Sequence, residues 1–272
     1  MKLPTFVYKD TSKIYFDILV LLLMIALCFL GPFFYPQDYH TQNLLLGAQK
    51  PSLQHWLGTD ALGRDLLARL LYGGRISIFI GCFVSLFAVT LGLIIGSISG
   101  FIGGNTDRLL MRIIDVLYPL PFTLLIILVM SLGGRHVWLL ILTMGSVKWM
   151  TMARMIRTQV TGLKTSAFVQ CSQSLGQSSF QIWWKHIFPN LGSILLVYGT
   201  LLMPNIILEE AFISFLGLGI QPPLCSLGSL IFSGANEMET APWLLLSPAL
   251  FFSVLLCFFN KLGDHLRDFF AL

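Results

Sequence analysis

Long apolar runs alternate with short polar segments along most of the chain. Six runs are long enough to cross a bilayer, because about 20 apolar residues span its hydrocarbon core. They cover approximately residues 15–34, 76–102, 109–132, 137–155, 191–216 and 241–262. The fourth run also contains Lys148 and Arg154 near its end. The pattern therefore predicts an all-α integral membrane protein with six transmembrane helices.

Composition supports this class and excludes others. The 272 residues are 56% hydrophobic and 11% charged, with a mean hydropathy of +0.79, whereas soluble domains carry about 25% charged residues. The net charge of +4 comes from scattered Lys and Arg side chains rather than from a basic stripe. We therefore expect membrane lipid, and no nucleic acid, as a partner.

The first apolar run is predicted to be a retained anchor. It follows Lys2, Lys9 and Lys13, as a secretion signal would, but residues 31–36 read GPFFYP and provide no small-residue cleavage site.

The distribution of basic residues predicts that both termini are cytoplasmic. With this orientation, twelve of the seventeen Lys and Arg residues lie inside and five lie outside, as the positive-inside rule requires. The inside set is Lys2, Lys9, Lys13, Arg108, Arg112, Lys148, Arg154, Arg157, Lys164, Lys185, Lys261 and Arg267, and the outside set is Lys50, Arg64, Arg69, Arg75 and Arg135. The polar segment at about 159–190 is then cytoplasmic.

That segment is too polar for the bilayer core, where a central Lys costs about 3 kcal/mol. Apolar residues recur at three-to-four spacing on each side of Gly176, which predicts two short amphipathic helices. The first set is Phe168, Cys171, Ser172 and Leu175, and the second is Phe180, Trp183, Trp184 and Ile187. Gly176 can adopt the positive φ of a sharp turn, and Pro189 marks the return to the bilayer. Such a pair either receives a partner protein or packs only on lipid and on the chain's own spans.

Several motifs resemble those of one transporter family. Gln170, Cys171 and Ser172, followed by Gly176 and by IFP at 187–189, resemble the EAA loop of ABC importer permeases. HWLGTDALGRD at 55–65 and RLLYGGRIS at 69–77 resemble the signature before the second span of peptide-importer permeases. EAFISFLGLG at 210–219, QPP at 221–223, APW at 241–243 and LGDHLRD at 262–268 are similar to the closing half of the same family. The chain thus resembles the C-type subunit of dipeptide and oligopeptide ABC importers, whose relatives also move glutathione, antimicrobial peptides or nickel.

The resemblance implies a type I importer core with cytoplasmic coupling helices in the bacterial inner membrane. It implies an anchor helix and external segment at 1–75, a five-helix core at 76–272 and an ATPase-docking loop at about 159–190. It also implies a heterodimer with a second permease subunit, two ATP-binding subunits and an extracytoplasmic substrate-binding protein. The ATPase-coupling residues it implies are Gln170, Cys171, Ser172, Leu175, Gly176, His186 and Pro189.

ATP chemistry is expected to belong to the partners. The chain has no GxxxxGK[ST] motif, so we expect no cofactor on this chain, with ATP and Mg²⁺ used by the ATPase subunits, and no enzymatic activity. The histidines show no metal-ligand spacing on any one helix. Two alternatives stay open, namely an importer of nickel or glutathione within the same family and an ATPase-independent transporter or scaffold.

Departures from the family pattern concern charge. Gln170, Cys171 and Ser172 replace Glu-Ala-Ala, so a salt bridge from that Glu to the ATPase is missing. Leu227 stands where the family usually has Trp, and Glu209 adds a carboxylate beside the expected Glu210. These changes indicate co-adapted partners or weakened coupling.

Polar and small residues inside the spans give further candidates. Glu210 and Pro204 are predicted for the translocation path, with a helix-end hydrogen bond as the alternative for Glu210. Ala88, Gly92, Gly96 and Gly100 form one ridge, either for internal packing or for the seam to a partner permease. Prolines in the third, fifth and sixth runs, including Pro119 and Pro121, permit kinks.

The external segment 35–74 is predicted to contain a helix capped by Thr59 or Asp60. That helix either meets a substrate-binding protein or braces the first span.

Overall fold

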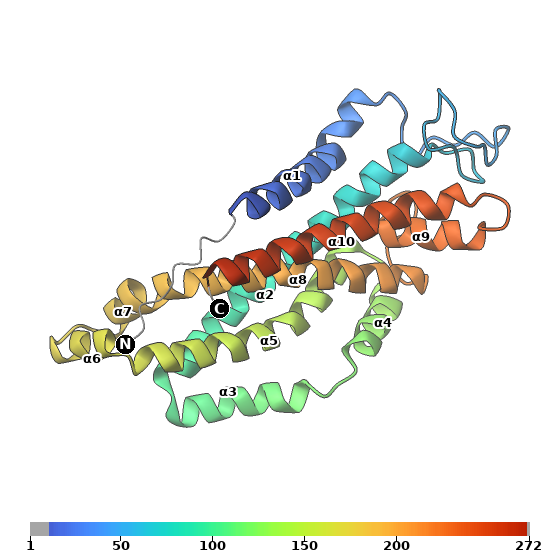
Figure 1. The fold of residues 1–272 in the computed structure, drawn as a ribbon. Helices are drawn as coiled ribbons and strands as arrows, with labels where there is room; N and C mark the ends of the chain where they lie inside the picture. The colour runs from blue at the N-terminus through green and yellow to red at the C-terminus, as the bar shows by residue number, and fades with distance from the viewer. Residues whose placement is uncertain (1–10, 271–272) are drawn as a thin grey trace. The chain divides into compact units, whose positions relative to one another are not determined.

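The computed structural model describes residues 11–270, which form helices joined by loops, with one isolated bridge between Thr59 and Asp65 (Figure 1). Lys2 and Lys9, which entered the orientation argument, lie outside the described residues. The helices are α1 (Thr11–Phe34), α2 (Leu66–Ile102), α3 (Gly104–Leu117), α4 (Phe122–Gly133), α5 (Val137–Lys164), α6 (Ala167–Ser174), α7 (Ser179–Ile182), the π-helix η1 (Trp183–Ile187), α8 (Phe188–Phe215), α9 (Leu227–Asn236) and α10 (Trp243–Phe270).

The predicted all-α membrane architecture is confirmed. Within the described residues, five helices are long and apolar enough to cross a membrane, and α3 with α4 makes a sixth span if the pair is counted as one. The two helices of that pair are bent by 74°. Pro119 and Pro121 lie in the break between the two helices. A helix is interrupted there because proline removes a backbone donor and clashes with the preceding turn. A kink in the third span is thus confirmed.

Some predicted boundaries are wrong. The helix expected in the external segment begins only at Leu66, as the start of α2, so neither Thr59 nor Asp60 is its N-cap. Asp65 caps α2 instead, since its Oδ1 accepts a hydrogen bond of 2.8 Å from the backbone N–H of Ala68. α2 therefore begins at Leu66 rather than at residue 76, and the division predicted between 75 and 76 falls inside this helix.

The charged side chains in the first turns of α2 are satisfied by neighbouring groups. Arg69 pairs with Asp60, and Arg75 donates to the backbone oxygens of Cys28 and Phe29. Similarly, α5 continues past residue 155 to Lys164, and α10 continues past 262 to Phe270. The length of an apolar run therefore underestimates the length of a helix whose polar end residues pair with other groups of the chain.

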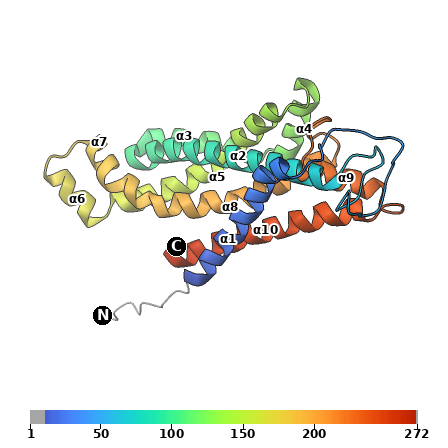
Figure 2. The same cartoon turned by 90° about the horizontal axis from the view of Figure 1, so that it is seen from above.

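The described chain forms two compact units. One comprises the described residues of Met1–Phe79 and Met203–Leu272, and the other is Ile80–Leu202. In the first unit, α10 packs against both α1 and α9 (Figure 2), and its core includes Met24, Cys28, Ile207 and Leu255.

The helix α9 was not predicted. Its signal is a capping box, in which the Ser226 and Ser229 side chains each accept from the other's backbone N–H. Glycines bring it close to its neighbours, because an added Cβ at Gly228 would lie 2.4 Å from the Cα of Ala211. A helix of ten residues with this packing is invisible to a search for long apolar runs.

In the second unit, the glycine ridge of α2 packs on α5. An added Cβ would lie 2.6 Å from Met152 Cβ at Gly92, 2.6 Å from the Ala153 oxygen at Gly96 and 2.7 Å from the Arg157 oxygen at Gly100. Internal packing, one of the two roles considered for this ridge, is confirmed.

Candidate functional site

The polar segment predicted for docking forms a short helical cap where α5 ends and α8 begins (Figures 1 and 2). The two predicted helices are present on either side of Gly176. The second is a single α turn, α7, which continues through η1 into α8. Pro189 therefore lies in the first turn of α8 rather than at a break. The wide turn before it, in which the N–H of Phe188 bonds the oxygen of Trp183, accommodates a residue that has no N–H to donate.

Gly176 makes the turn between the helices. Its φ is 78°, in the left-handed region that glycine adopts without strain, so the predicted positive φ is confirmed. Its N–H bonds the oxygen of Gln173, and the N–H of Gln177 bonds the oxygen of Ser172, which satisfies the carbonyls at the end of α6. Ser178 and Gln181 then form a capping box that starts α7.

The inner face of the cap is apolar and buried. Val169, Ile182 and Ile187 pack with Ile156 and Val160 of α5 in one core cluster. Ser172 is also buried on this face. The predicted grouping of Ser172 with Phe168, Cys171 and Leu175 is thus wrong, because those three side chains are exposed while Ser172 is buried.

The outer face exposes large apolar side chains that the chain itself leaves uncovered. The exposed fractions are 43% for Phe168, 80% for Leu175, 72% for Phe180 and 55% for Trp184. Trp184 stacks on Phe188 with 5.1 Å between ring centroids, which fixes its orientation. An exposed apolar face on short helices with a buried inner side has the character of a protein-binding surface. We call this set the outer docking face.

A polar link holds the two halves of the cap together. His186 Nε2 lies 3.2 Å from Ser172 Oγ and 3.3 Å from Gln177 Oε1. The Ser172 hydroxyl donates to the oxygen of Phe168, so a hydrogen bond between Ser172 Oγ and His186 Nε2 requires the imidazole tautomer that carries its hydrogen on Nε2. Gln170 is exposed and donates from Nε2 to the oxygen of Thr165 at 3.2 Å. The seven predicted coupling residues therefore lie on one cap, with Ser172 and His186 as its internal link.

Glu210 occupies a different setting, in the first unit. Its side chain is fully buried, and its carboxylate accepts from Ser77 Oγ at 2.9 Å and from Ser214 Oγ at 2.7 Å. Ser77 Oγ also accepts from the N–H of Leu227, the first residue of α9. Glu210 thus joins α2, α8 and α9, and Pro204 is buried on the same helix.

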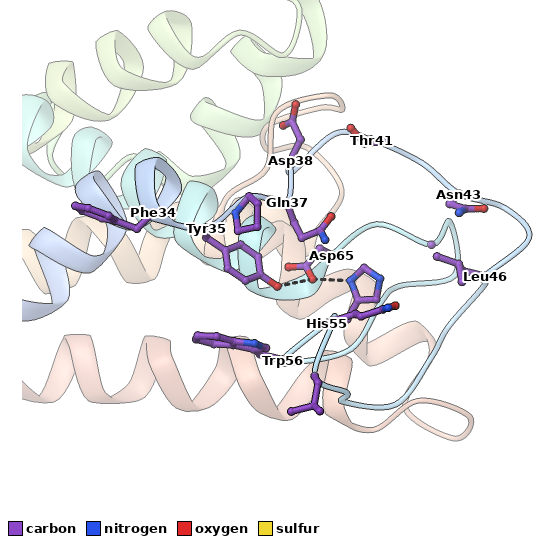
Figure 3. Close-up of a pocket in the computed structure, with 14 residues that line it drawn as sticks. Phe34, Tyr35, Gln37, Asp38, Thr41, Asn43, Leu46, His55, Trp56 and Asp65 are labelled. Carbon is purple, nitrogen blue, oxygen red and sulfur yellow. Dashed lines mark hydrogen bonds and ion pairs between the residues drawn. The ribbon is translucent and has the colours of Figure 1, made fainter.

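The external segment contains a second polar cluster, whose Tyr35 and His55 sequence reasoning missed. Asp65 Oδ2 accepts from the Tyr35 hydroxyl at 2.9 Å and lies 2.8 Å from His55 Nδ1 (Figure 3). Tyr35 and His55 line a cavity of about 590 Å³, and Trp56 and Asp38 also form part of its wall. The available signal was an Asp directly before an apolar run, which is an N-cap pattern.

Comparison with known proteins gives matches to membrane components of transport systems. The model of the family described as binding-protein-dependent transport system inner membrane component matches residues 92–271. The chain is 41% identical over 254 residues to the oligopeptide transport system permease protein OppC of Haemophilus influenzae, covering 93% of this chain and 82% of that protein. It is 42% identical to OppC of Bacillus subtilis, covering 96% and 86% respectively. It is 40% identical to the dipeptide transport system permease protein DppC of the same organism, covering 92% and 78%.

The fold has a solved counterpart in an inward-facing conformation of the MetNI methionine ABC transporter. The TM-score is 0.59 at 17% identity, covering 74% of this chain and 95% of that chain. This likeness confirms the importer-permease fold, and the family description with the apolar helices indicates a multi-pass protein of the bacterial inner membrane. The chain belongs to the family of inner-membrane components of binding-protein-dependent transport systems.

Proposed function

We propose that the chain is a permease subunit of an ATP-driven importer of di- and oligopeptides and forms half of the translocation path. The observation that carries this proposal is the 40–42% identity to permeases named for oligopeptide and dipeptide transport, over more than nine tenths of the chain. The other half of the path comes from a second permease subunit. An extracytoplasmic binding protein delivers the peptide.

Two ATP-binding subunits power the importer, and one of them docks on the outer docking face of this chain. The chain contains no phosphate-binding loop motif, so ATP and Mg²⁺ are bound by those subunits and this chain is not catalytic. The excess of Lys and Arg in the segments assigned to the inside supports cytoplasmic termini and a cytoplasmic cap.

Closure of the ATPase subunits moves the cap, and the motion passes inward through Val169, Ile182 and Ile187 to α5. α5 responds as a rigid body together with α2, because the glycine ridge leaves no gap between the two helices. The spans then alternate between outward-open and inward-open arrangements. Glu210 and Pro204 stay candidates for the path, and a contact between Glu210 and a peptide amino group requires its bonds to Ser77 and Ser214 to open.

The docking assignment is tested with two matched leucines outside the spans. Leu175 is 80% exposed on the outer docking face, and Leu53 is 97% exposed in the external segment. Leu175→Asp is expected to lower co-purification of the ATPase subunits and peptide uptake at least tenfold, at an unchanged membrane level. Leu53→Asp is expected to leave co-purification unchanged. Normal co-purification with Leu175→Asp contradicts the assignment, and absence of any ATPase from the wild-type complex favours an ATPase-independent transporter.

The cargo is tested by uptake of a labelled tripeptide in cells with and without this gene. Loss of uptake on deletion, competed by unlabelled peptides but not by nickel or glutathione, supports a peptide importer. Unchanged tripeptide uptake contradicts it and favours nickel or glutathione as cargo.

A further inference from the structure

A polar cavity in the second unit lies beside the cap and includes no residue of the outer docking face, although Gln170, one of the predicted coupling residues, lines it. Its volume is about 340 Å³. The end of α2, the start of α3, the last turns of α5 and one side of α6 form its wall. The polar side chains that line it include Ser99, Asp107, Arg157, Lys164, Gln170 and Gln173.

The charges around this cavity do not cancel. Arg157 donates to both oxygens of Asp107, at 2.6 and 2.5 Å, and the Ser99 hydroxyl donates to the same carboxylate. This ion pair is internally neutral. Among the described residues, the only hydrogen-bond acceptor of Lys164 is the backbone oxygen of Phe101, at 2.6 Å, and its ammonium group lies over the Phe101 ring. In the part of the chain that the structure describes, no carboxylate lies within ion-pair distance of Lys164, so the cavity has one uncompensated positive charge.

Neutral donors complement this charge. Gln170 uses one amide hydrogen on the oxygen of Thr165 and keeps a second, and the amide of Gln173 lines the same wall. Gly103, the N-cap of α3, also lines the cavity and has no side chain to cap the helix. The first-turn N–H groups of α3 therefore add partial positive charge to that provided by Lys164.

The cavity lies where two membrane helices end. The apolar spans finish at Ile102 on α2 and at Lys164 on α5. Ile102 and Leu109, on either side of the first turn of α3, are 60% and 64% exposed and give acyl chains an apolar surface to follow. Basic pockets between helix ends at the cytoplasmic leaflet suit the phosphate of anionic lipids.

We infer that this cavity binds the phosphate of an anionic phospholipid headgroup, with Lys164 as the charged ligand and the amides of α6 as neutral donors. Because Gln170 and Gln173 belong to α6, a bound headgroup holds the cap against α5. The binding itself does not depend on the proposed peptide transport, and it is measured on the isolated chain.

The test uses the full chain purified in a neutral detergent, with lipid binding measured by native mass spectrometry. Phosphatidylglycerol is expected to bind at least tenfold more tightly than phosphatidylcholine, and to raise the Tm of the protein as a ligand of the folded state does. Lys164→Gln is expected to reduce phosphatidylglycerol affinity about tenfold, as loss of one charge-assisted contact does. Lys164→Arg is expected to retain binding, which guards against a general folding defect.

Lys261 provides the matched control. It lies near the end of α10, over the ring of Phe258, much as Lys164 lies over that of Phe101, but it does not line this cavity. Lys261→Gln is expected to leave affinity unchanged.

Three results overturn the inference. The first is equal phosphatidylglycerol binding by Lys164→Gln and the wild type. The second is saturation by inorganic phosphate with the same Lys164 dependence and no added effect of lipid. The third is loss of ATPase co-purification in Lys164→Gln with unchanged lipid binding, which assigns the cavity to an acidic side chain of a partner.

Discussion

The two large polar inserts of the chain, the part of the external segment before Leu66 (35–65) and the cap at 165–187, differ in how they hold their charged side chains. In the external segment, charged groups turn inward, and the Asp65 side chain is 2% exposed. In the cap, apolar groups turn outward, and Leu175 is 80% exposed. Both inserts expose leucine side chains, Leu53 at 97% and Leu175 at 80%, so the buried charges, and not the exposed apolar surface, set the external segment apart.

The backbone explains the difference. The external segment lacks a helix before Leu66, so its backbone groups depend on side chains such as Thr59, which accepts from the N–H of Gln49 and donates to the oxygen of Gly47. The cap satisfies its backbone within short helices. Its side chains are then free for a partner. The hydrogen bond between Tyr35 and Asp65 also joins the end of α1 to the N-terminal residue that caps α2, which supports the bracing role considered for the external segment.

The largest expected effect comes from disrupting the buried charge network around Asp60 in the external segment. Asp60→Ala leaves Arg69 buried without its carboxylate and also removes the partner of Arg64. Loss of one member of a buried pair costs about 3–5 kcal/mol, so we expect poor accumulation in the membrane and a Tm lowered by many degrees in detergent.

The control is an exposed ion pair of the same chemistry. Asp264 pairs with Arg267 on α10 at 3.1 Å, with about half of each side chain exposed. Asp264→Ala is expected to change stability by less than about 0.5 kcal/mol. Equal effects of the two substitutions would show that the external network is not a brace.

The next effect concerns the turn of the cap. Gly176→Trp forces an L residue into a φ of 78°, at a cost of about 1–2 kcal/mol, although an added Cβ meets no atom within 4 Å. We expect normal membrane insertion with peptide uptake and ATPase stimulation strongly reduced. Gly176→Asn, which tolerates this conformation better, should retain most of both. Normal transport by the Trp variant would contradict the coupling assignment.

Sequence alone predicted the parts of this comparison that depend on local chemistry. Run length and charge gave the spans, and glycine chemistry gave the turn at Gly176, because both are properties of neighbouring residues. The network around Asp65 was missed, since Tyr35 and His55 reach it across 30 and 10 positions in the chain. The start of α2 was also misplaced, because the charge of Arg69 is neutralised by a residue outside the helix.

Helical spacing similarly could not separate the two faces of the cap. Cys171 and Ser172 are adjacent and therefore point about 100° apart, so only one of them could follow Leu175 outward. In the structure Ser172 is the buried one, on the side of α6 that contacts His186. The enclosure of Glu210 was unpredictable for the same reason, because the helix α9 that completes it has no long apolar signal.

A smaller effect is expected from Tyr35→Phe, whose stability measured against pH tests whether Tyr35 braces the external segment. Burial, and then the hydrogen bond to Asp65, raise the pKa of the Tyr35 hydroxyl above its ordinary value. The folded state therefore favours the neutral phenol. This contribution is complete below the unfolded pKa of about 10 and is lost as pH rises through the folded value. Tyr35→Phe should lose about 1 kcal/mol at pH 7 and show a shallower fall in stability above pH 10, measured by unfolding in detergent against pH.

The smallest expected effect lies in the link inside the cap. His186→Ala removes contacts to Ser172 and Gln177 and leaves the apolar inner face intact. Each exchanged hydrogen bond contributes about 0.5–1.5 kcal/mol, so global stability should change little. Amide hydrogen exchange should quicken at residues 177–182, whose position against α6 depends on this link, while exchange in the external segment stays unchanged. Unchanged exchange in the cap would mean that apolar packing by Val169 and Ile182 alone holds its two helices together. The arrangement of the outer docking face would then not depend on the hydrogen bonds of His186.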